Sequence, residues 1–354
     1  MNNLKKFFKN KKILITGHTG FKGSWMSLVL YHFGSKVYGY SLKPPTTPSN
    51  YSILNIKNII KGTNTGDVRD YSKLKKYIHK VKPEIIFHMA AQSLVKTSYS
   101  KTIDTFNTNV IGTTNILEIS KNLPSLRSLV IITSDKCYKN LEKKTGYKEE
   151  DILGGSDPYS ASKACAETII YSYEKSFFKN IKKVGLASVR AGNVIGGGDW
   201  SEDRIIPDTI RSITKKKQII LRSPNSVRPW QHVLDPINGY LILAKRLYLS
   251  PQKYSGPWNF GPHLVKKYTV KKLVEKLISY MNINKKIFIK QNLNLKETNL
   301  LILNCNKSIK KLNWKIKWDV KKSIMMTAKW YSCYLNKRNK IKSFSFDQIS
   351  EFFK

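Results

Sequence analysis

Lys12-Ile-Leu-Ile-Thr-Gly17-His-Thr-Gly20-Phe-Lys-Gly23 is the stretch of this 354-residue chain that decides the fold. Its apolar beginning predicts a short buried strand, and the amphipathic segment 24–33 that follows predicts a helix. Gly17 permits a tight turn between them, Gly20 lets the backbone approach a pyrophosphate, and Gly23 lets helix and strand pack closely. The spacing is G-x-x-G-x-x-G rather than G-x-G-x-x-G, and an ordinary turn is the alternative. Strand and helix on either side favour a dinucleotide site at the helix N-terminus.

The first half of the chain alternates apolar, strand-like runs with helical segments, which is typical of a doubly wound parallel sheet. The predicted strands cover residues 12–16, 36–40, 59–63, 84–88, 128–133 and 184–190. The predicted helices cover residues 23–33, 72–80, 99–121 and 157–178. We therefore expect an α/β fold of the Rossmann type.

The pattern changes after residue 190. Loops rich in glycine and proline alternate with predicted helices at 205–214, 269–280 and 320–335, and Trp258-Asn-Phe-Gly-Pro262 predicts a turn. We expect a Rossmann domain in residues 1–190 and a smaller mixed α/β region in residues 191–354. This second region is expected to bind mainly substrate, over the carboxyl-terminal edge of the sheet, with some later segments returning to the sheet. The lysine-rich C-terminal tail is expected to dock as a short helix.

The composition indicates a globular protein of the cytoplasm. Hydrophobic residues make up 41% of the chain, and no apolar run approaches the roughly 18 residues of a membrane span. The basic N-terminus is not followed by an apolar signal core. The four cysteines, at positions 137, 165, 305 and 333, have no C-x-x-C or metal-ligand spacing, which suits a reducing compartment and predicts no metal site. Cys137 is interpreted as a small packing residue.

The strongly basic charge raises the hypothesis of nucleic-acid binding. Lysine and arginine number 63 against 23 acidic residues, which gives a formal net charge of +40. The lysines are spread along the whole chain with abundant isoleucine and asparagine, as A+T-rich coding sequences produce. No basic helix stripe with interleaved aromatic residues is present. We therefore predict no specific nucleic-acid partner, although the charge would attract an anionic small molecule.

Two groups of reactive side chains follow the fifth predicted strand. Ser134 ends that strand, and Tyr159 and Lys163 lie one helical turn apart in the next helical segment. An unperturbed tyrosine has a pKa of about 10, so a nearby ammonium group is needed to favour its phenolate at neutral pH. Asp135 and Lys136 add an acid and an amine that can remove water, which a plain oxidoreductase does not need. The place of Asp135 and Lys136 directly after a strand favours catalysis over a surface turn. For Tyr159 and Lys163, the hydroxyl behind the strand and the glycine turn favour catalysis over an exposed pair on an ordinary helix.

With these residues the chain resembles the extended short-chain dehydrogenase/reductases, and within them the nucleotide-sugar 4,6-dehydratases, in particular the branch that acts on CDP-glucose. The resemblance covers residues 11–335. It rests on the motifs Thr16-Gly-His-Thr-Gly-Phe-Lys-Gly-Ser-Trp25, His88-Met-Ala-Ala-Gln-Ser93, Thr133-Ser-Asp-Lys-Cys-Tyr138, Asp157-Pro-Tyr-Ser-Ala-Ser-Lys163, Arg190-Ala-Gly-Asn-Val-Ile-Gly-Gly-Gly-Asp-Trp200, Arg228-Pro-Trp-Gln-His232 and Trp258-Asn-Phe-Gly-Pro262. The dTDP-glucose and GDP-mannose dehydratases carry glutamate where this chain has Lys136, and that difference favours the CDP-sugar branch.

The resemblance implies a reaction in three steps. NAD takes a hydride from sugar C4 while Tyr159 accepts the hydroxyl proton, and Ser134 is hydrogen-bonded to the same oxygen. Lys136 then removes the acidified C5 proton, and Asp135 protonates the departing C6 hydroxyl. The hydride finally returns to C6. Lys163 is expected to favour the Tyr159 phenolate and to bind the nicotinamide ribose.

The same resemblance implies the binding residues. Those expected to contact the cofactor, together with Tyr159 and Lys163, are Gly17, His18, Gly20, Phe21, Lys22, Gly23, Ser41, Asp67, Val68, Ala90, Ala91 and Gln92. Asp67 is the expected adenine contact, with a turn or helix cap as the alternative. The second strand ends without an acidic residue for a ribose hydroxyl, so the sequence leaves NAD and NADP open. NAD is preferred because the reaction regenerates its own cofactor. Those expected to contact the substrate are Gln92, Ser93, Asn193, Arg204, Pro207, Arg228, Trp230 and His232.

Other functions stay open. A dehydratase for another nucleotide-hexose is the nearest alternative. An epimerase or ketoreductase of the same superfamily would not need Asp135 and Lys136, and a noncatalytic NAD sensor would be expected to lose Tyr159 or Lys163. We also expect a homodimer, or a higher homo-oligomer, that pairs through the predicted helices 99–121 and 157–178.

Overall fold

A seven-stranded sheet in the order β10-β6-β5-β4-β1-β2-β3 forms the centre of the molecule, and all neighbouring strands in it are parallel. The computed structural model describes residues 2–262, 268–290 and 300–354. The strands are β1 (Lys12–Thr16), β2 (Lys36–Ser41), β3 (Gly62–Thr65), β4 (Ile85–His88), β5 (Ser128–Ile132), β6 (Gly185–Ala191) and β10 (Gly256–Phe260). The predicted Rossmann-type sheet is confirmed. Strand order reverses between β1 and β4, and ligands bind outside the carboxyl ends of strands at such a point.

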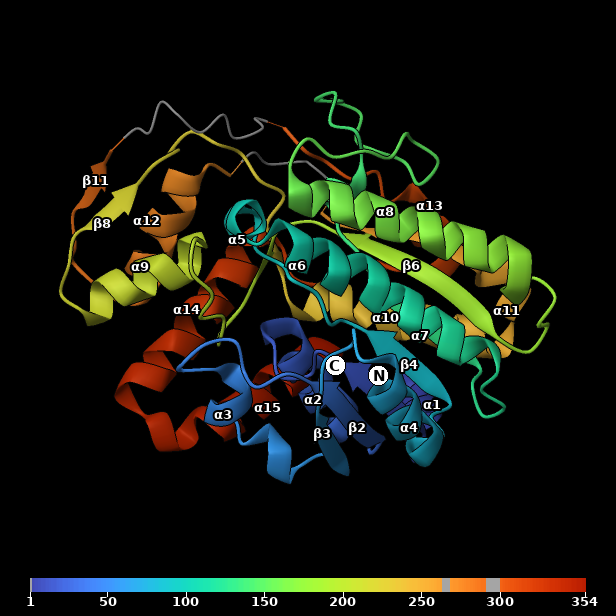
Figure 1. Ribbon diagram of the computed structural model, residues 1–354. Helices are drawn as coiled ribbons and strands as arrows, with labels where there is room; N and C mark the ends of the chain where they lie inside the picture. The colour runs from blue at the N-terminus through green and yellow to red at the C-terminus, as the bar shows by residue number, and fades with distance from the viewer. Residues whose placement is uncertain (1, 263–267, 291–299) are drawn as a thin grey trace.

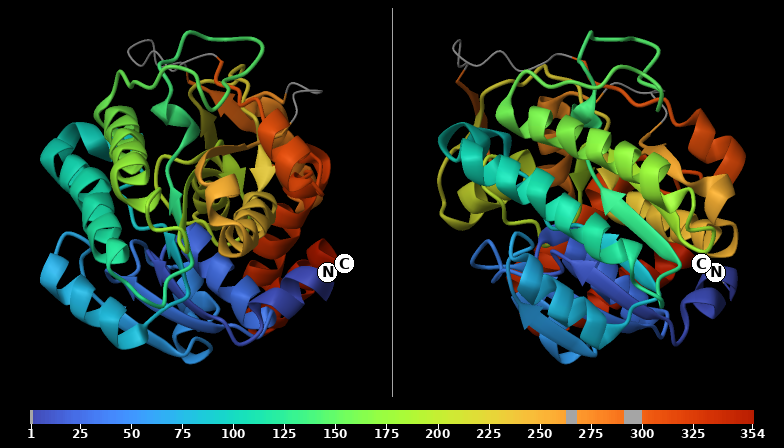
Figure 2. Two further views of the ribbon diagram at one scale, coloured as in Figure 1. Left: turned by 90° about the vertical axis from the view of Figure 1, so that its right-hand side faces the viewer. Right: turned by 45° about the vertical axis from the view of Figure 1, so that its right-hand side comes forward.

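Helices cover both faces of the sheet, since successive strand residues point to opposite sides. Leu14 and Ile86 face one side, where Figure 1 shows α4 (Tyr71–Val81), α7 (Gly112–Lys121) and α8 (Pro158–Tyr173). Ile13 and Ile15 face the other side, which is covered by α2 (Phe21–His32), α10 (Leu234–Leu249) and α15 (Ile341–Phe353). Both views in Figure 2 show the sheet between these two layers.

Several predicted elements differ from the observed ones, and the predicted helix 157–178 is one of them, since it ends in a π-helical turn (Glu174–Phe178). The predicted helix 99–121 is divided into α5 (Val95–Ser100), α6 (Thr102–Phe106), a π-helical turn (Asn107–Ile111) and α7. Lys101 breaks it because its backbone is not helical, with φ −127° and ψ 54°. The predicted turn at 258–262 is largely the edge strand β10, which pairs with β6. The third predicted strand, 59–63, is displaced to 62–65, where the residues are polar.

The predicted amphipathic helix after the glycine turn is buried on almost every side. Residues from Gly23 to Leu30 of α2 are all buried, because the helix lies between the sheet, α10 and α15. The C-terminal tail docks as predicted, although it forms a helix of 13 residues. The Phe353 ring of α15 packs edge-on against Phe33, with ring centroids 5.0 Å apart.

The second half of the chain also carries the predicted helices, as α9 (Ile205–Thr214), α12 (Val270–Tyr280) and α14 (Val320–Asn336). Two short parallel pairs accompany them, β8 (Ile219–Leu221) with β11 (Ile287–Ile289) and β7 (Val194–Ile195) with β9 (Gln231–His232). The remaining α-helices are α1 (Asn2–Phe8), α3 (Asn50–Ile53), α11 (Pro251–Tyr254) and α13 (Asn306–Leu312). Within the described residues, no helix has the length and apolar character needed to cross a membrane.

Candidate active site

The turn between β1 and α2 has the shape of a phosphate cradle. Gly17 has φ +72°, and a Cβ on it would lie 2.7 Å from the backbone nitrogen of Ala90. A Cβ on Gly23 would lie 2.2 Å from the carbonyl oxygen of Gly17. A Cβ on Gly20 would lie 3.4 Å from the Gly17 carbonyl oxygen, which is an ordinary contact distance. Because no described side chain caps α2, the N–H groups of its first turn can bind an anion such as a pyrophosphate.

Two predicted cofactor residues brace this turn. The Ser41 hydroxyl lies 2.8 Å from that of Thr19 and so ties the turn to the end of β2. The buried His18 ring packs over Gly39, with Nε2 2.8 Å from the Thr63 hydroxyl. Burial lowers the pKa of His18 to about 4, so the ring is neutral at pH 7. The His18 ring supports β2 and β3, which leaves its backbone for any cofactor contact.

The carboxylate of Asp67, which was predicted to contact adenine, forms an ion pair with the neighbouring Arg69. Arg69 donates to its carboxylate from Nη2 at 2.7 Å, from Nε at 3.0 Å and from the backbone N–H at 2.9 Å. Burial would raise the pKa of Asp67, but these hydrogen bonds hold it below its usual value. The Val68 side chain is buried under α7, against Gly112. This geometry matches the turn interpretation of Asp67, and its contact with adenine stays a prediction.

A buried hydrogen-bond chain that the sequence did not predict begins at the end of β1. The Thr16 hydroxyl lies 2.8 Å from Nδ1 of His88 and accepts the N–H groups of Met89 and Ala90 at 3.1 and 3.2 Å. Nε2 of His88 lies 3.3 Å from the Thr113 hydroxyl. Burial lowers the pKa of His88 to about 3. A neutral imidazole therefore joins the two hydroxyls and fixes the loop after β4.

Asn109, in the π-helical turn, continues this chain to α8. It accepts from Thr113 through its carbonyl at 2.7 Å, and its side chain accepts the Gln92 N–H at 2.9 Å. Its amide donates to the Ser162 hydroxyl at 2.9 Å, and Ser162 donates to the Tyr159 carbonyl at 2.7 Å. Asn109 is 1% exposed, and the π-helical turn brings it inward, as such turns often do at functional sites. The glycine turn after β1 and the helix α8, which carries Tyr159 and Lys163, are thus held in one network.

Gln92 is engaged by its own loop. Its amide donates to the Leu94 carbonyl at 3.0 Å and to the Thr105 hydroxyl at 2.9 Å, and its side-chain oxygen accepts the Leu94 N–H. The neighbouring Ala90 and Ala91 are half-buried. The Gln92 side chain therefore shapes the loop, and its predicted contact with nicotinamide or sugar is not supported by these bonds.

The Ser134–Lys136 segment forms a tight turn at the carboxyl end of β5. The Ser134 hydroxyl donates to Asp135 Oδ1 at 3.0 Å and accepts the Lys136 N–H at 3.2 Å. Asp135 is 4% exposed. Burial raises the pKa of its carboxyl, against the opposing charges of Lys136 and Lys22. Burial thus favours the protonated form of this carboxyl, and a protonated carboxyl can donate its proton to a leaving hydroxyl.

Tyr159 and Lys163 lie on the first turns of α8 and are both buried. Burial raises the pKa of Tyr159 to about 12, and the Ser134 hydroxyl and Arg204 oppose that shift. Burial and the charge of Lys22 lower the pKa of Lys163 to about 8, and its Nζ donates to the Ile132 carbonyl at 3.4 Å. The charge of Arg204 thus acts on the Tyr159 phenol in this structure, and the predicted action of Lys163 on it stays a prediction.

Glu167, one turn beyond Lys163, is a second feature that the sequence analysis missed. Its carboxylate is 2.7 Å from Nη2 of Arg190 and accepts from the hydroxyls of Ser188, at 2.8 Å, and Thr133. Glu167 and Arg190 are each 3% exposed. The pair ties α8 to β6, and the Thr133 hydroxyl adds the end of β5 to this contact. The signal in the sequence was the i, i+4 spacing of Lys163 and Glu167, two charges on one face of a predicted buried helix.

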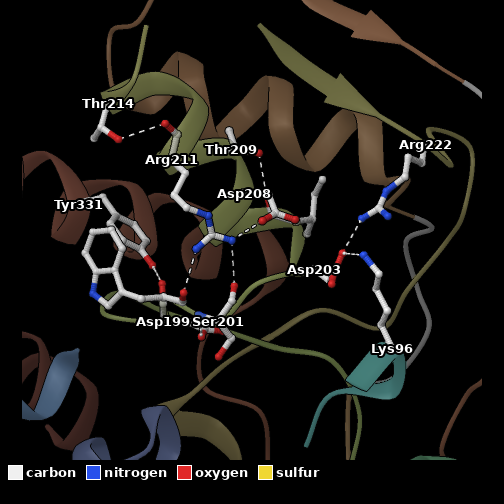
Figure 3. A network of polar contacts seen from close by, with 12 residues as sticks. Lys96, Asp199, Ser201, Asp203, Asp208, Thr209, Arg211, Thr214, Arg222 and Tyr331 are labelled. Carbon is white, nitrogen blue, oxygen red and sulfur yellow. Dashed lines mark hydrogen bonds and ion pairs between the residues drawn. The ribbon is translucent and has the colours of Figure 1, made fainter. Parts of the chain in front are cut away.

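Arg204 reaches across the site from the predicted substrate region. Its Nη1 pairs with Asp199 at 2.9 Å, and its Nη2 donates to the Ser93 hydroxyl at 3.3 Å. Figure 3 shows how the loop behind it is fixed, since Arg211 donates to the carbonyls of Trp200 and Ser201 at 2.8 and 3.1 Å. The structure therefore brings this predicted substrate residue near Tyr159.

The remaining predicted substrate residues differ in access. Asn193 and Arg228 are half-buried, whereas Pro207 is buried within α9. Trp230 is 7% exposed, and its indole N–H has no hydrogen-bond acceptor among the described residues. His232 was predicted to wall the substrate, but it is fully buried, with its ring 4.7 Å from that of Trp318. Packing thus accounts for the position of His232, and its contact with substrate stays a prediction.

Comparison with known proteins identifies the family. The GDP-mannose 4,6-dehydratase family pattern matches residues 14–327. The CDP-glucose 4,6-dehydratase of Salmonella typhimurium is 44% identical over 335 residues, which are 94% of this chain and 93% of that protein. The chain belongs to this family of nucleotide-sugar 4,6-dehydratases. The resemblance seen in the sequence motifs is thus confirmed.

Solved structures of the wider superfamily share the fold. The dTDP-glucose 4,6-dehydratase of Bacillus anthracis in complex with NAD has a TM-score of 0.75 at 24% identity, over 92% of this chain and 97% of that one. An epimerase of Methanothermobacter thermautotrophicus has a TM-score of 0.80 at 18% identity, over 96% and 97%. Dehydratases and epimerases have the same architecture, so the side chains of the site must distinguish them.

Proposed function

We propose that the chain is an NAD-dependent CDP-glucose 4,6-dehydratase, which forms CDP-4-dehydro-6-deoxyglucose and water. The observation that carries this proposal is the Ser134-Asp135-Lys136 turn, in which a buried carboxyl with a raised pKa lies beside an amine. A 4-epimerase breaks no bond to a departing hydroxyl and has no use for that pair. The 44% identity to a CDP-glucose 4,6-dehydratase supports the choice of nucleotide.

The glycine turn fits the pyrophosphate of NAD, because Gly20 is the N-cap of α2 and no described side chain caps this helix N-terminus. When bound, NAD supplies the hydride acceptor at C4 and the hydride donor at C6. Ser41 steadies the turn, and the loop at Ala90, held by Thr16, borders it. These contacts with the cofactor are part of the proposal.

In the first step Tyr159 accepts the proton of the C4 hydroxyl, and Ser134 hydrogen-bonds the same oxygen. The Tyr159 pKa of about 12 is too high for this role at neutral pH. The pKa of Tyr159 must therefore be lower in the complex with substrate and NAD. Arg204, Ser134 and the ammonium of Lys163 are the groups proposed to lower it. All three groups stabilise negative charge on the phenolic oxygen.

In the second step the new C4 carbonyl acidifies the C5–H bond. Lys136 takes that proton, the C5–C6 double bond forms, and Asp135 gives its proton to the C6 oxygen, which leaves as water. Hydride return to C6 and a proton at C5 complete the product. Arg204, Arg228 and Asn193 are the proposed contacts to the diphosphate and nucleotide.

A direct assay tests this function. The purified protein would be incubated separately with CDP-glucose, dTDP-glucose, UDP-glucose and GDP-mannose, and any 4-keto-6-deoxy product identified by mass. We expect rapid turnover of CDP-glucose and slow turnover of dTDP-glucose. Faster turnover of another nucleotide-hexose would show that the proposed substrate is wrong. An epimerised hexose formed without loss of water would show that the proposed reaction is wrong.

We also propose that the enzyme is a cytoplasmic homodimer, or a higher oligomer of that dimer. Large apolar side chains are uncovered on α5, α6 and α8, where Tyr99 is 64% exposed, Ile103 76% and Tyr171 60%. A second copy would remove this surface from water.

Light scattering should show a dimer at micromolar concentration, and Ile103→Glu should shift it toward the monomer. The control is Leu249→Glu, which changes a residue that is 59% exposed at the end of α10; a monomeric wild-type protein would contradict the proposal.

A further inference from the structure

Two cations from different parts of the chain converge on one carboxylate oxygen. Nζ of Lys96, on α5, lies 3.4 Å from Oδ1 of Asp203, and Nη2 of Arg222, which follows β8, lies 3.2 Å from the same atom. Figure 3 shows Lys96 and Arg222 approaching Asp203 from two separate elements. The three residues bridge the loops of the large sheet and the proposed substrate region.

This group adjoins the candidate active site. Asp203 immediately precedes Arg204, which bonds to Ser93 and whose charge acts on Tyr159. Ser93 lies three residues before Lys96. The segment 93–96 therefore contacts the loop before α9 twice, through the bond of Ser93 with Arg204 and through the ion pair of Lys96 with Asp203. The two cations therefore lie at the border of the site rather than on a remote surface.

The ion pairs of Asp203 are exposed, whereas the neighbouring pair of Arg204 with Asp199 in the same loop is largely buried. Lys96 is 70% exposed, Arg222 46% and Asp203 32%. Long, exposed ion pairs to a single oxygen contribute little stability and are readily exchanged. Arg204, in contrast, is held at 2.9 Å by Asp199, which is 5% exposed. The loop is thus firmly built, while the two cations can change partner at little cost.

We propose that Lys96 and Arg222 are further binding residues for the diphosphate of the nucleotide sugar, and that Asp203 holds them in place until the diphosphate replaces it. This inference rests on the proposed function. A diphosphate offers more charge than one carboxylate and several oxygens at once, and the arginine fork can bind two of them. The diphosphate then takes over both cations, and the Asp203 carboxylate turns to solvent.

Calorimetric titration with CDP tests the inference, at about 50 mM salt, where exposed charges are weakly screened. Lys96→Ala and Arg222→Ala should each weaken CDP binding about tenfold and flatten its dependence on salt. In turnover assays the same variants should raise KM for CDP-glucose and leave kcat nearly unchanged. Cytidine, which lacks the diphosphate, should bind them as it binds the wild-type protein.

Asp203→Asn gives a result of opposite sign. Because the competing charge is removed, CDP should bind this variant about threefold more tightly. Lys175→Ala is the matched control, since Lys175 is 49% exposed and pairs with Glu174 at 3.0 Å in the π-helical turn (Glu174–Phe178) that follows α8. It should bind CDP as the wild-type protein does.

Three outcomes overturn the proposal. Unchanged CDP affinity in both alanine variants would remove Lys96 and Arg222 from the site. Weaker CDP binding by Asp203→Asn would mean that the three residues only stabilise the structure and do not bind the diphosphate. A folded wild-type protein that binds none of CDP, dTDP, UDP or GDP would overturn the proposed function together with this inference, and that result is distinct from the other two.

Discussion

Replacing Glu167 with glutamine is expected to destabilise the fold strongly. Glu167 and Arg190 lie 2.7 Å apart and are each 3% exposed. Glutamine keeps the shape of the side chain but leaves a buried guanidinium without its counter-charge, and removing one partner of a buried pair costs about 3–5 kcal/mol. The free energy of unfolding should therefore fall by that amount, far more than for an exposed pair, which contributes about 0–1 kcal/mol.

Urea unfolding followed by tryptophan fluorescence can measure this cost in a double-mutant cycle. The cycle compares Glu167→Gln, Arg190→Met and the double variant, in which neither buried charge is left. The double variant should lose less stability than the sum of the two single ones, by about 2 kcal/mol or more. Glu118→Gln is the control, because its pair with Lys121 has a similar length, 2.9 Å, but Glu118 is 38% exposed.

The pH dependence of the same variants checks the origin of the effect. Burial alone would raise the pKa of Glu167, but Arg190 and the hydroxyls of Thr133 and Ser188 hold it below the ordinary value of 4.5. A carboxyl whose pKa is depressed in the folded state stabilises the fold above its unfolded pKa, and this stability is lost as the pH falls through the folded pKa. The gap between wild type and Glu167→Gln should therefore shrink in acid. Strictly additive single losses, or a loss below about 1 kcal/mol, would refute the reasoning.

Four further variants test the site itself. Tyr159→Phe should abolish both NADH formation, followed by absorbance, and product, because no proton acceptor is left at the C4 oxygen; persistent NADH formation would assign that role elsewhere. Lys136→Ala should still oxidise C4 and accumulate NADH, but mass spectrometry in deuterated water should show no exchange at C5; normal exchange would mean that another residue is the base. Gly17→Ala should weaken NAD binding at least about tenfold in calorimetry, since φ is +72° and the new Cβ would lie 2.7 Å from Ala90; wild-type affinity would contradict this. Arg228→Ala should weaken substrate binding by about 1.5–3 kcal/mol if Arg228 contacts phosphate, and an unchanged dissociation constant would exclude that contact.

Local patterns were enough to predict most of the sheet and the reactive turn. Buried parallel strands such as β1 and β5 are short apolar runs, and glycines or reactive polar residues follow them directly in the sequence. Ser134, Asp135 and Lys136 could be placed at a strand end for this reason. Tyr159 and Lys163 could be placed together because their spacing is one turn of a helix.

Tertiary contacts explain what could not be predicted. The strand β3 is Gly-Thr-Asn-Thr, which forms because β2 pairs with it and not because its side chains are apolar. Asn109 and His88 are polar residues inside apparently ordinary elements. Only the fold shows that both of them bond to the hydroxyl of Thr113. His232 belongs to a motif that suggests ligand contact, but the aromatic rings around it come from α2 and from Trp318, far away in the sequence.

The edge strand β10 has a consequence for how this protein can be divided. The polypeptide leaves the sheet after β6, builds much of the proposed substrate region, and then returns as α10 and β10 to finish the sheet. A fragment that ended at residue 190 would expose the flank of β6 and uncover the apolar face on which α10 packs. We expect such a fragment to aggregate rather than to bind the dinucleotide on its own. We therefore expect that the N-terminal part cannot be exchanged between relatives as an independent module, because its core is completed by α10 and β10.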